Sequence, residues 1–179
     1  MQTEPRLTLD HLFSLFPDRS DEPAIVMRPE TEVPEPYRQL LVHTHHMTVT
    51  VEEYYHQPVD VKVLEFWQRG DDYARKILLT LRGTGQVVQF GIVRIDLSLL
   101  SPAVRQEIEA GRTPLGRILI ENNVLRTVQP IGYFEVALSS AMMNWFGLSE
   151  PRTTYGRIGV IFTDGRPAIQ VAEILSPIS

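Results

Sequence analysis

Two segments give the strongest indication of the fold: Tyr73-Ala74-Arg75-Lys76-Ile77-Leu78-Leu79-Thr80-Leu81 and Ile169-Gln170-Val171-Ala172-Glu173-Ile174-Leu175. Both segments alternate, so each places one charged residue, Arg75 or Glu173, among apolar residues on the face that should turn inward. A buried charge is costly unless it is paired or has a task. Two inward charges within one core therefore predict either a salt bridge or a pocket for a small anion.

The composition is that of an ordinary globular protein. The chain has 179 residues, 43% of them hydrophobic and 22% charged, so a single domain over residues 1–179 with a real core is expected. The formal net charge of -5 argues against nucleic-acid partners, which require a basic face. There are no cysteines, which excludes disulfides, thiol catalysis and cysteine-ligated metals.

The segment Met1–Pro5 lacks a basic patch followed by an apolar run, as a secretory signal would have. No apolar stretch approaches the ~20 residues that span a bilayer. No membrane partner is therefore expected, the cytoplasm is the expected location, and a monomer or small homo-oligomer is the expected state.

Two hairpins carry the main pattern. Their strands cover residues 73–81 with 87–95 and residues 154–162 with 167–175, and the second pair is joined by Asp164-Gly165, a strong hairpin signal. Two more strands are expected over 59–66 and 128–136, and helices over 7–16, 36–41, 50–55, 101–111, 115–121 and 138–146. Thr50-Val51-Glu52-Glu53 has the capping-box pattern, and the acidic, proline-rich segment 18–36 indicates a loop. Runs of antiparallel strands with helices set apart predict an α+β fold.

Each inward charge has two interpretations. Arg75 is either a strand arginine that pairs with a carboxylate or snorkels to the rim, or a fork that grips a ligand carboxylate through two parallel hydrogen bonds. Glu173 is either the partner of an inward arginine or a desolvated carboxyl with a raised pKa. Arg157 is the best partner for Glu173, or else a second carboxylate clamp.

Other motifs indicate less. Thr113-Pro114-Leu115-Gly116-Arg117 is a turn leading into a helix, and its free backbone N–H groups could hold an anion, although any helix start has this form. His43 and His46 lie three residues apart, but no acidic ligand stands at motif spacing, so no metal is expected. Neither a Gly-x-Ser-x-Gly nor a Gly-x-Gly-x-x-Gly motif occurs.

Read together, residues 73–79, 113–117 and 172–177, with Gly156-Arg157 and the segment Leu40–Thr48, resemble chorismate pyruvate-lyase, in its divergent cyanobacterial and actinobacterial branch. The resemblance covers about Leu40 to Pro177. It implies one α+β domain with a six-stranded antiparallel sheet, helices packed on it and helical flaps over residues 36–57 that enclose one ligand pocket. An N-terminal helix and an acidic, proline-rich loop would precede them over residues 1–35.

That family eliminates pyruvate from chorismate and leaves 4-hydroxybenzoate, without a cofactor. The resemblance implies that Arg75 binds the ring carboxylate, that Glu173 lies at the ring hydroxyl, and that both are the catalytic residues. Backbone groups of Met47 and Leu115 would complete the substrate pocket, with Arg157 beside it. One departure is the second core strand, where the family has Gly-Arg-Thr-Val and this chain has Gly91-Ile92-Val93-Arg94.

The alternative is a non-catalytic module that binds a small aromatic acid, because the same fold serves as the effector domain of bacterial regulators. Those regulators carry a winged-helix DNA reader in front, and the N-terminal segment here is expected to be too short and too acidic for one. A third interpretation, a purely structural partner protein, leaves Arg75 and Glu173 with no role beyond pairing.

Overall fold

One antiparallel sheet forms the centre of the protein. The computed structural model describes residues 7–179, so the expectation about Met1–Pro5 lies outside the described residues. Within them the sheet has seven strands in the order β1-β5-β6-β7-β4-β3-β2. The strands are β1 (Ala24–Arg28), β2 (Val59–Arg69), β3 (Asp72–Leu81), β4 (Val87–Asp96), β5 (Arg126–Ala137), β6 (Thr153–Thr163) and β7 (Arg166–Leu175). The helices are α1 (Leu9–Ser14), α2 (Tyr37–Leu41), α3 (Met47–Tyr55), α4 (Pro102–Ala110), α5 (Leu115–Glu121) and α6 (Ser140–Trp145), with short 3-10 turns at Glu30–Glu32 and Leu97–Leu99.

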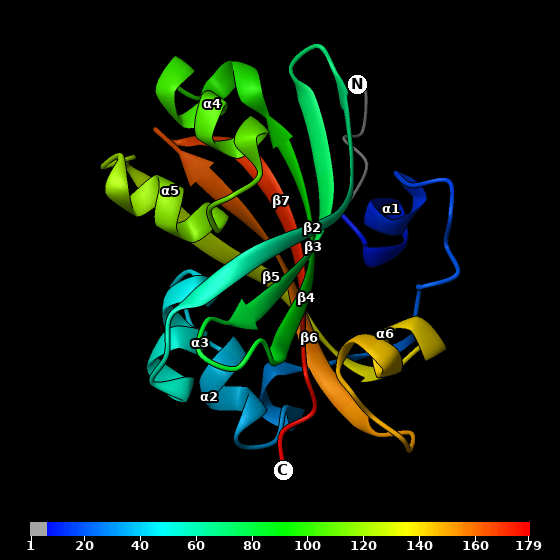
Figure 1. Ribbon diagram of the computed structural model, residues 1–179. Coiled ribbons are helices and arrows are strands. Elements are labelled where there is room, and N and C mark those ends of the chain that lie inside the picture. The colour runs from blue at the N-terminus through cyan, green and yellow to red at the C-terminus, as the bar shows by residue number, and fades with distance from the viewer. Residues whose placement is uncertain (1–6) are drawn as a thin grey trace.

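The helices cover both faces of the sheet. Helices α2, α3, α4 and α5 lie on one face, and α1 and α6 lie on the other (Figure 1). This division follows from strand alternation, because β3 turns Arg75, Ile77 and Leu79 toward the first face and Ala74 and Leu78 toward the second. No helix in the described part of the chain has both the length and the apolar character needed to cross a membrane.

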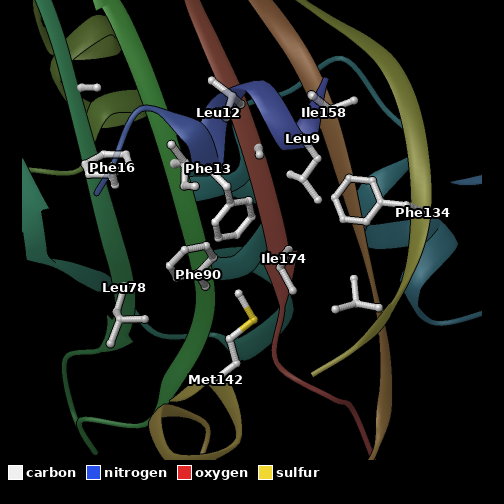
Figure 2. Packing of buried hydrophobic residues seen from close by; sticks show 14 of the residues in the cluster. Leu9, Leu12, Phe13, Phe16, Leu78, Phe90, Phe134, Met142, Ile158 and Ile174 are labelled. Carbon is white, nitrogen blue, oxygen red and sulfur yellow. The ribbon is translucent and has the colours of Figure 1, made fainter. Parts of the chain in front are cut away.

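The face under α1 and α6 is a dry core. Phe13 of α1 lies parallel to Phe90 of β4 with ring centroids 6.0 Å apart, and both are buried among leucine and isoleucine side chains (Figure 2). Lys76 is 2% exposed on this face, and its Nζ donates to Asp21 at 2.8 Å and lies 4.8 Å from the Phe16 ring centroid. This buried ion pair fastens the chain after α1 to strand β3.

The sheet has seven strands, so the expected number of six is wrong. The additional strand is β1, which lies inside the segment predicted to be a loop and pairs with β5 from Ala24 opposite Ala137 to Arg28 opposite Tyr133. Its apolar residues lie between Pro23 and Pro29, and flanking prolines are typical of a loop, so the strand was not predicted from the sequence. Prolines at both ends are compatible with an edge strand, and the extended form is stabilised by pairing with β5, which is far away in sequence.

Helix α3 begins three residues before the predicted start, so the predicted capping box is wrong. The helix starts at Met47, and Thr50 lies inside it, where its hydroxyl donates to the carbonyl of His46 at 3.3 Å. The earlier start places Met47 and Thr48 on the helix and over the sheet. Both predicted hairpins, β3 with β4 and β6 with β7, are confirmed.

Candidate ligand-binding site

A cavity lies between the sheet and the first turns of α3 and α5. Four of the five predicted site residues line it: Arg75 on β3, Glu173 on β7, Met47 on α3 and Leu115 on α5. The remaining lining is mostly apolar and is contributed by Val61, Ile77, Leu79, Gly91, Val93, Ile161 and Val171, with His46, Thr48 and Gln89 as further polar members. The roles of these residues in binding stay predictions.

The cavity has a volume of about 50 Å³. A volume of this size holds a few water molecules, whereas an apolar cavity that binds benzene measures ~150 Å³. A ring-sized ligand therefore requires Met47 and Leu115 to move outward with the starts of their helices. The expectation that this part of the chain acts as a flap is compatible with that geometry.

Arg75 is buried without a carboxylate partner. Its side chain is 1% exposed, and its Nη1 donates to the carbonyl of Ile108 at 3.3 Å. Its Nε is buried and has no hydrogen-bond partner among the described residues, whose ion pairs also do not include Arg75. Burial lowers the pKa of Arg75 below its ordinary value. The site thus contains a desolvated guanidinium that lines the cavity and whose Nε has no partner among the described residues.

Glu173 is paired, and its partner is Arg157. The Nε of Arg157 donates to Oε2 of Glu173 at 2.7 Å, and the two residues lie opposite each other on β6 and β7. Arg157 is 1% exposed and does not line the cavity. Arg157 is therefore the ion-pair partner of Glu173, and its role as a second carboxylate clamp stays a prediction.

Arg157 also fastens the chain between α2 and α3. Its Nη1 donates to the carbonyls of Leu41 at 3.2 Å and His43 at 3.0 Å, and its Nη2 donates to the carbonyl of His45 at 2.9 Å. The side chain that holds Glu173 thus also holds the segment leading into Met47. Arg157 therefore connects the sheet, which forms the floor of the cavity, with the chain leading into α3, which covers it.

Helix α3, with His46 just before it, contacts α5 at two places and the start of β5 at a third. Glu52 of α3 pairs with Arg117 of α5, and a Cβ built on Gly116 would lie 2.9 Å from the Cβ of His46. The third link is a hydrogen bond from Arg126 Nε to His46 Nε2 at 2.7 Å, which requires that nitrogen to be unprotonated. Burial, followed by the charge of Arg126, lowers the pKa of His46 to about 4.

The histidines that invited a metal interpretation do not converge on one point. The His43 ring contacts the carbonyl of Leu40 at 2.7 Å and the Thr50 hydroxyl at 3.1 Å, whereas His46 bonds to Arg126. Burial, followed by the charge of Arg157, lowers the pKa of His43 to about 4. Residues 7–179 hold no cluster of three or more side chains that could bind a metal ion.

Sequence reasoning missed Gln89, a lining residue on β4. It is 3% exposed, and its side-chain oxygen has no hydrogen-bond partner among the described residues. The signal was present, because the alternation that places Gly91 and Val93 on the cavity face also places Gln89 there. A lone polar residue on an inward strand face is the same pattern that singled out Arg75.

Comparisons with known proteins show a fold but no family. No protein-family model matches the chain, and no curated protein gives a significant sequence match. Among solved structures, PhnF from Mycobacterium smegmatis gives a TM-score of 0.53 at 10% identity, covering 75% of this chain and 65% of that chain. The effector domain of PhnF solved alone gives 0.48 at 10% identity, covering 74% and 88%. A GntR-family transcriptional regulator from Bacillus cereus gives 0.44 at 13% identity, covering 66% and 92%.

At these identities only the fold is shown. The chain is an α+β protein built on an open antiparallel sheet, and it shares that architecture with PhnF. This fold is compatible with the resemblance to chorismate pyruvate-lyase, which has no support from a sequence match.

Proposed function

We propose that the protein binds a small carboxylic acid, with Arg75 as the anchor for the carboxylate. The observation that carries this proposal is the buried, unpaired Nε of Arg75 beside a cavity. A desolvated charge without a partner is destabilising, and a ligand carboxylate would remove that penalty through two parallel, charge-assisted hydrogen bonds. The anchoring must be local, because the net charge of -5 gives no long-range attraction for an anion.

The body of the ligand is apolar. Apart from Arg75, the cavity wall consists mainly of aliphatic side chains such as Ile77, Val93 and Leu115. Pockets of this kind combine an apolar lining with a few polar groups that fix orientation. A small aromatic acid, which has one flat apolar ring and one carboxylate, meets both requirements.

The shared fold supports a binding role. PhnF, which has this architecture, contains an effector domain. A domain of that kind needs a pocket that recognises a ligand and does not need to convert it. The pairing of Glu173 with Arg157 at 2.7 Å agrees with such a role, because the carboxylate already has a partner in the protein.

A second candidate is the cleavage of chorismate into pyruvate and 4-hydroxybenzoate. The observation that favours it is that Glu173 lines the same cavity as Arg75, as the resemblance to chorismate pyruvate-lyase implies. In this reaction the enolpyruvyl ether bond breaks and the ring loses a hydrogen, so that the ring becomes aromatic. Glu173 would accept that proton or orient the hydroxyl, and Arg75 would hold the ring carboxylate.

Titration calorimetry with benzoate and with its neutral analogue benzamide tests the binding proposal. We expect benzoate to bind about 10- to 100-fold more tightly, because the amide cannot form the charged bidentate contact. Arg75→Met should abolish this preference. Arg82→Met is the matched control, since Arg82 follows the same strand but forms an exposed pair with Asp60. Equal affinity for both compounds, or an unchanged preference in Arg75→Met, would overturn the proposal.

Incubation with chorismate separates the two candidates. Release of pyruvate, unchanged by a chelator, would establish the lyase, and Glu173→Gln should then lower turnover by roughly 10²–10⁴ if Glu173 transfers the proton. Intact chorismate together with tight, Arg75-dependent binding of 4-hydroxybenzoate would leave the binding module as the function.

A further inference from the structure

The cavity face of the sheet carries three rows of side chains. In the first, Arg75 lies opposite Val93, which lies opposite Val171. In the second, Ile77, Gly91 and Glu173 are neighbours in the same way, and in the third Leu79, Gln89 and Leu175 are. Since a strand rises about 3.3 Å per residue, the second row is ~7 Å and the third ~13 Å from the first.

The third row ends the cavity with an amide that has an unsatisfied atom. Gln89 is 3% exposed between Leu79 and Leu175, and both neighbours are apolar and buried. Its Oε1 has no hydrogen-bond partner among the described residues. A buried amide in apolar surroundings is costly unless something bonds to it, and both lining polar groups with unmet atoms, Arg75 and Gln89, face one cavity.

The middle row has a glycine between these two groups, and the neighbouring Ile77 side chain packs over it. Gly91 has no side chain, and a Cβ added there would lie 3.3 Å from Cδ1 of Ile77. Glu173 borders this row from β7 but is held by Arg157. A ligand that lies along β4 from Arg75 to Gln89 would therefore replace the end of the Ile77 side chain over Gly91.

We propose that Gln89 is a specificity-determining residue that binds a neutral hydrogen-bonding group at the far end of the ligand. The ligand is then an acid with a carboxylate at Arg75, an apolar ring over Gly91, and a hydroxyl, carbonyl or carboxamide at Gln89. A second carboxylate at that end is disfavoured, because Gln89 offers only an uncharged amide and Glu173 lies between. This inference rests on the proposed carboxylate binding and extends it to the chemistry of the far end.

Two para-substituted benzoates of nearly equal shape test the inference: 4-carbamoylbenzoate and 4-isopropylbenzoate. Calorimetry should show that the wild type binds the carbamoyl compound about tenfold more tightly, since one buried polar pair is satisfied. Gln89→Met, an unbranched apolar side chain of similar length, should reverse the preference. Gln89→Leu is a second variant, and melting curves should show both folded, because an apolar side chain suits a row flanked by Leu79 and Leu175.

The outcomes distinguish this inference from the proposed function. If both benzoates bind through Arg75 but with equal affinity, or if Gln89→Met leaves their ratio unchanged, the role of Gln89 is wrong and carboxylate binding stands. If the wild type binds neither of the two substituted benzoates nor unsubstituted benzoate, the proposed carboxylate binding is itself wrong.

Discussion

Arg75 and Glu173 line one cavity from neighbouring rows of the sheet, but of the two only Glu173 has an ionic partner among residues 7–179. Its carboxylate accepts from Arg157 at 2.7 Å, whereas the Nε of Arg75 has no partner among the described residues. Two charges that look equivalent in the sequence therefore differ in the free-energy cost of their burial. The ion pair is complete within the folded protein, whereas the unpaired cation is the group to which the proposed ligand would bind.

The first prediction compares two adjacent cations of β3. Arg75→Met removes a buried charge without a partner, so we expect unliganded stability to stay the same or to rise by about 1–4 kcal/mol. Lys76→Met removes one half of the buried pair with Asp21, so we expect a loss of about 3–5 kcal/mol. Urea unfolding of both variants measures the difference. A large loss of stability in Arg75→Met would mean that Arg75 has a structural role.

Most of the fold could be predicted from local patterns. Alternation and turn chemistry located both hairpins, because each half of a hairpin is specified by residues close in sequence. Strand β1 could not be found this way. Its segment carries two flanking prolines and acidic neighbours, and its extended form depends on pairing with β5 more than a hundred residues later.

The candidate site divides in a similar manner. Strand periodicity was sufficient to place Arg75 and Glu173 on one face of the sheet. The same periodicity places Gln89 on that face, but a single polar residue in a strand was not enough to predict a site residue. Periodicity could not say which arginine pairs with Glu173, because that depends on the register of β6 against β7. The start of α3 could not be predicted, because the contact of His46 with Gly116 joins residues that are far apart in the sequence.

A second prediction concerns the Arg157–Glu173 pair. Arg157→Leu should destabilise the protein by about 3–5 kcal/mol, because it leaves Glu173 without its partner and frees the carbonyls of residues 41, 43 and 45. The double variant Arg157→Leu/Glu173→Leu should recover part of that loss. A thermodynamic cycle from chemical denaturation measures the coupling. Strictly additive losses would show that the pair contributes no coupling.

The third prediction is a pH dependence. His43 and His46 both have a pKa of about 4 in the folded protein, below the ordinary value of 6.5. Below pH 6.5 the unfolded chain binds more protons, so stability is complete above pH 6.5 and falls as the pH drops toward 4. His46 is buried, so solvent screens little of its contribution, and it should account for about 3 kcal/mol of this loss.

Denaturation at a series of pH values checks this dependence. His46→Gln keeps a neutral hydrogen-bonding group toward Arg126, so its stability should change less between pH 7 and pH 4 than that of the wild type. His45→Gln is the control, because the exposed His45 side chain is not part of the Arg126 contact. Identical profiles for the wild type and His46→Gln would contradict the assignment.

The last prediction uses Gly116, where two effects oppose each other. Glycine in a helix is less favourable than alanine by ~1 kcal/mol, so Gly116→Ala would stabilise α5 if the helix were isolated. In the protein the new Cβ would lie 2.9 Å from the Cβ of His46 and 3.0 Å from Oγ1 of Thr48, and overpacking of this kind costs about 1–3 kcal/mol. The clash should prevail, so we expect a net loss of stability, with faster amide exchange at the starts of α3 and α5. Thr48→Ala removes one of the two contacts and should reduce the penalty of Gly116→Ala. A stabilised Gly116→Ala protein with unchanged exchange would mean that the two helices are not closely packed in solution, and that the cover over Arg75 is already open.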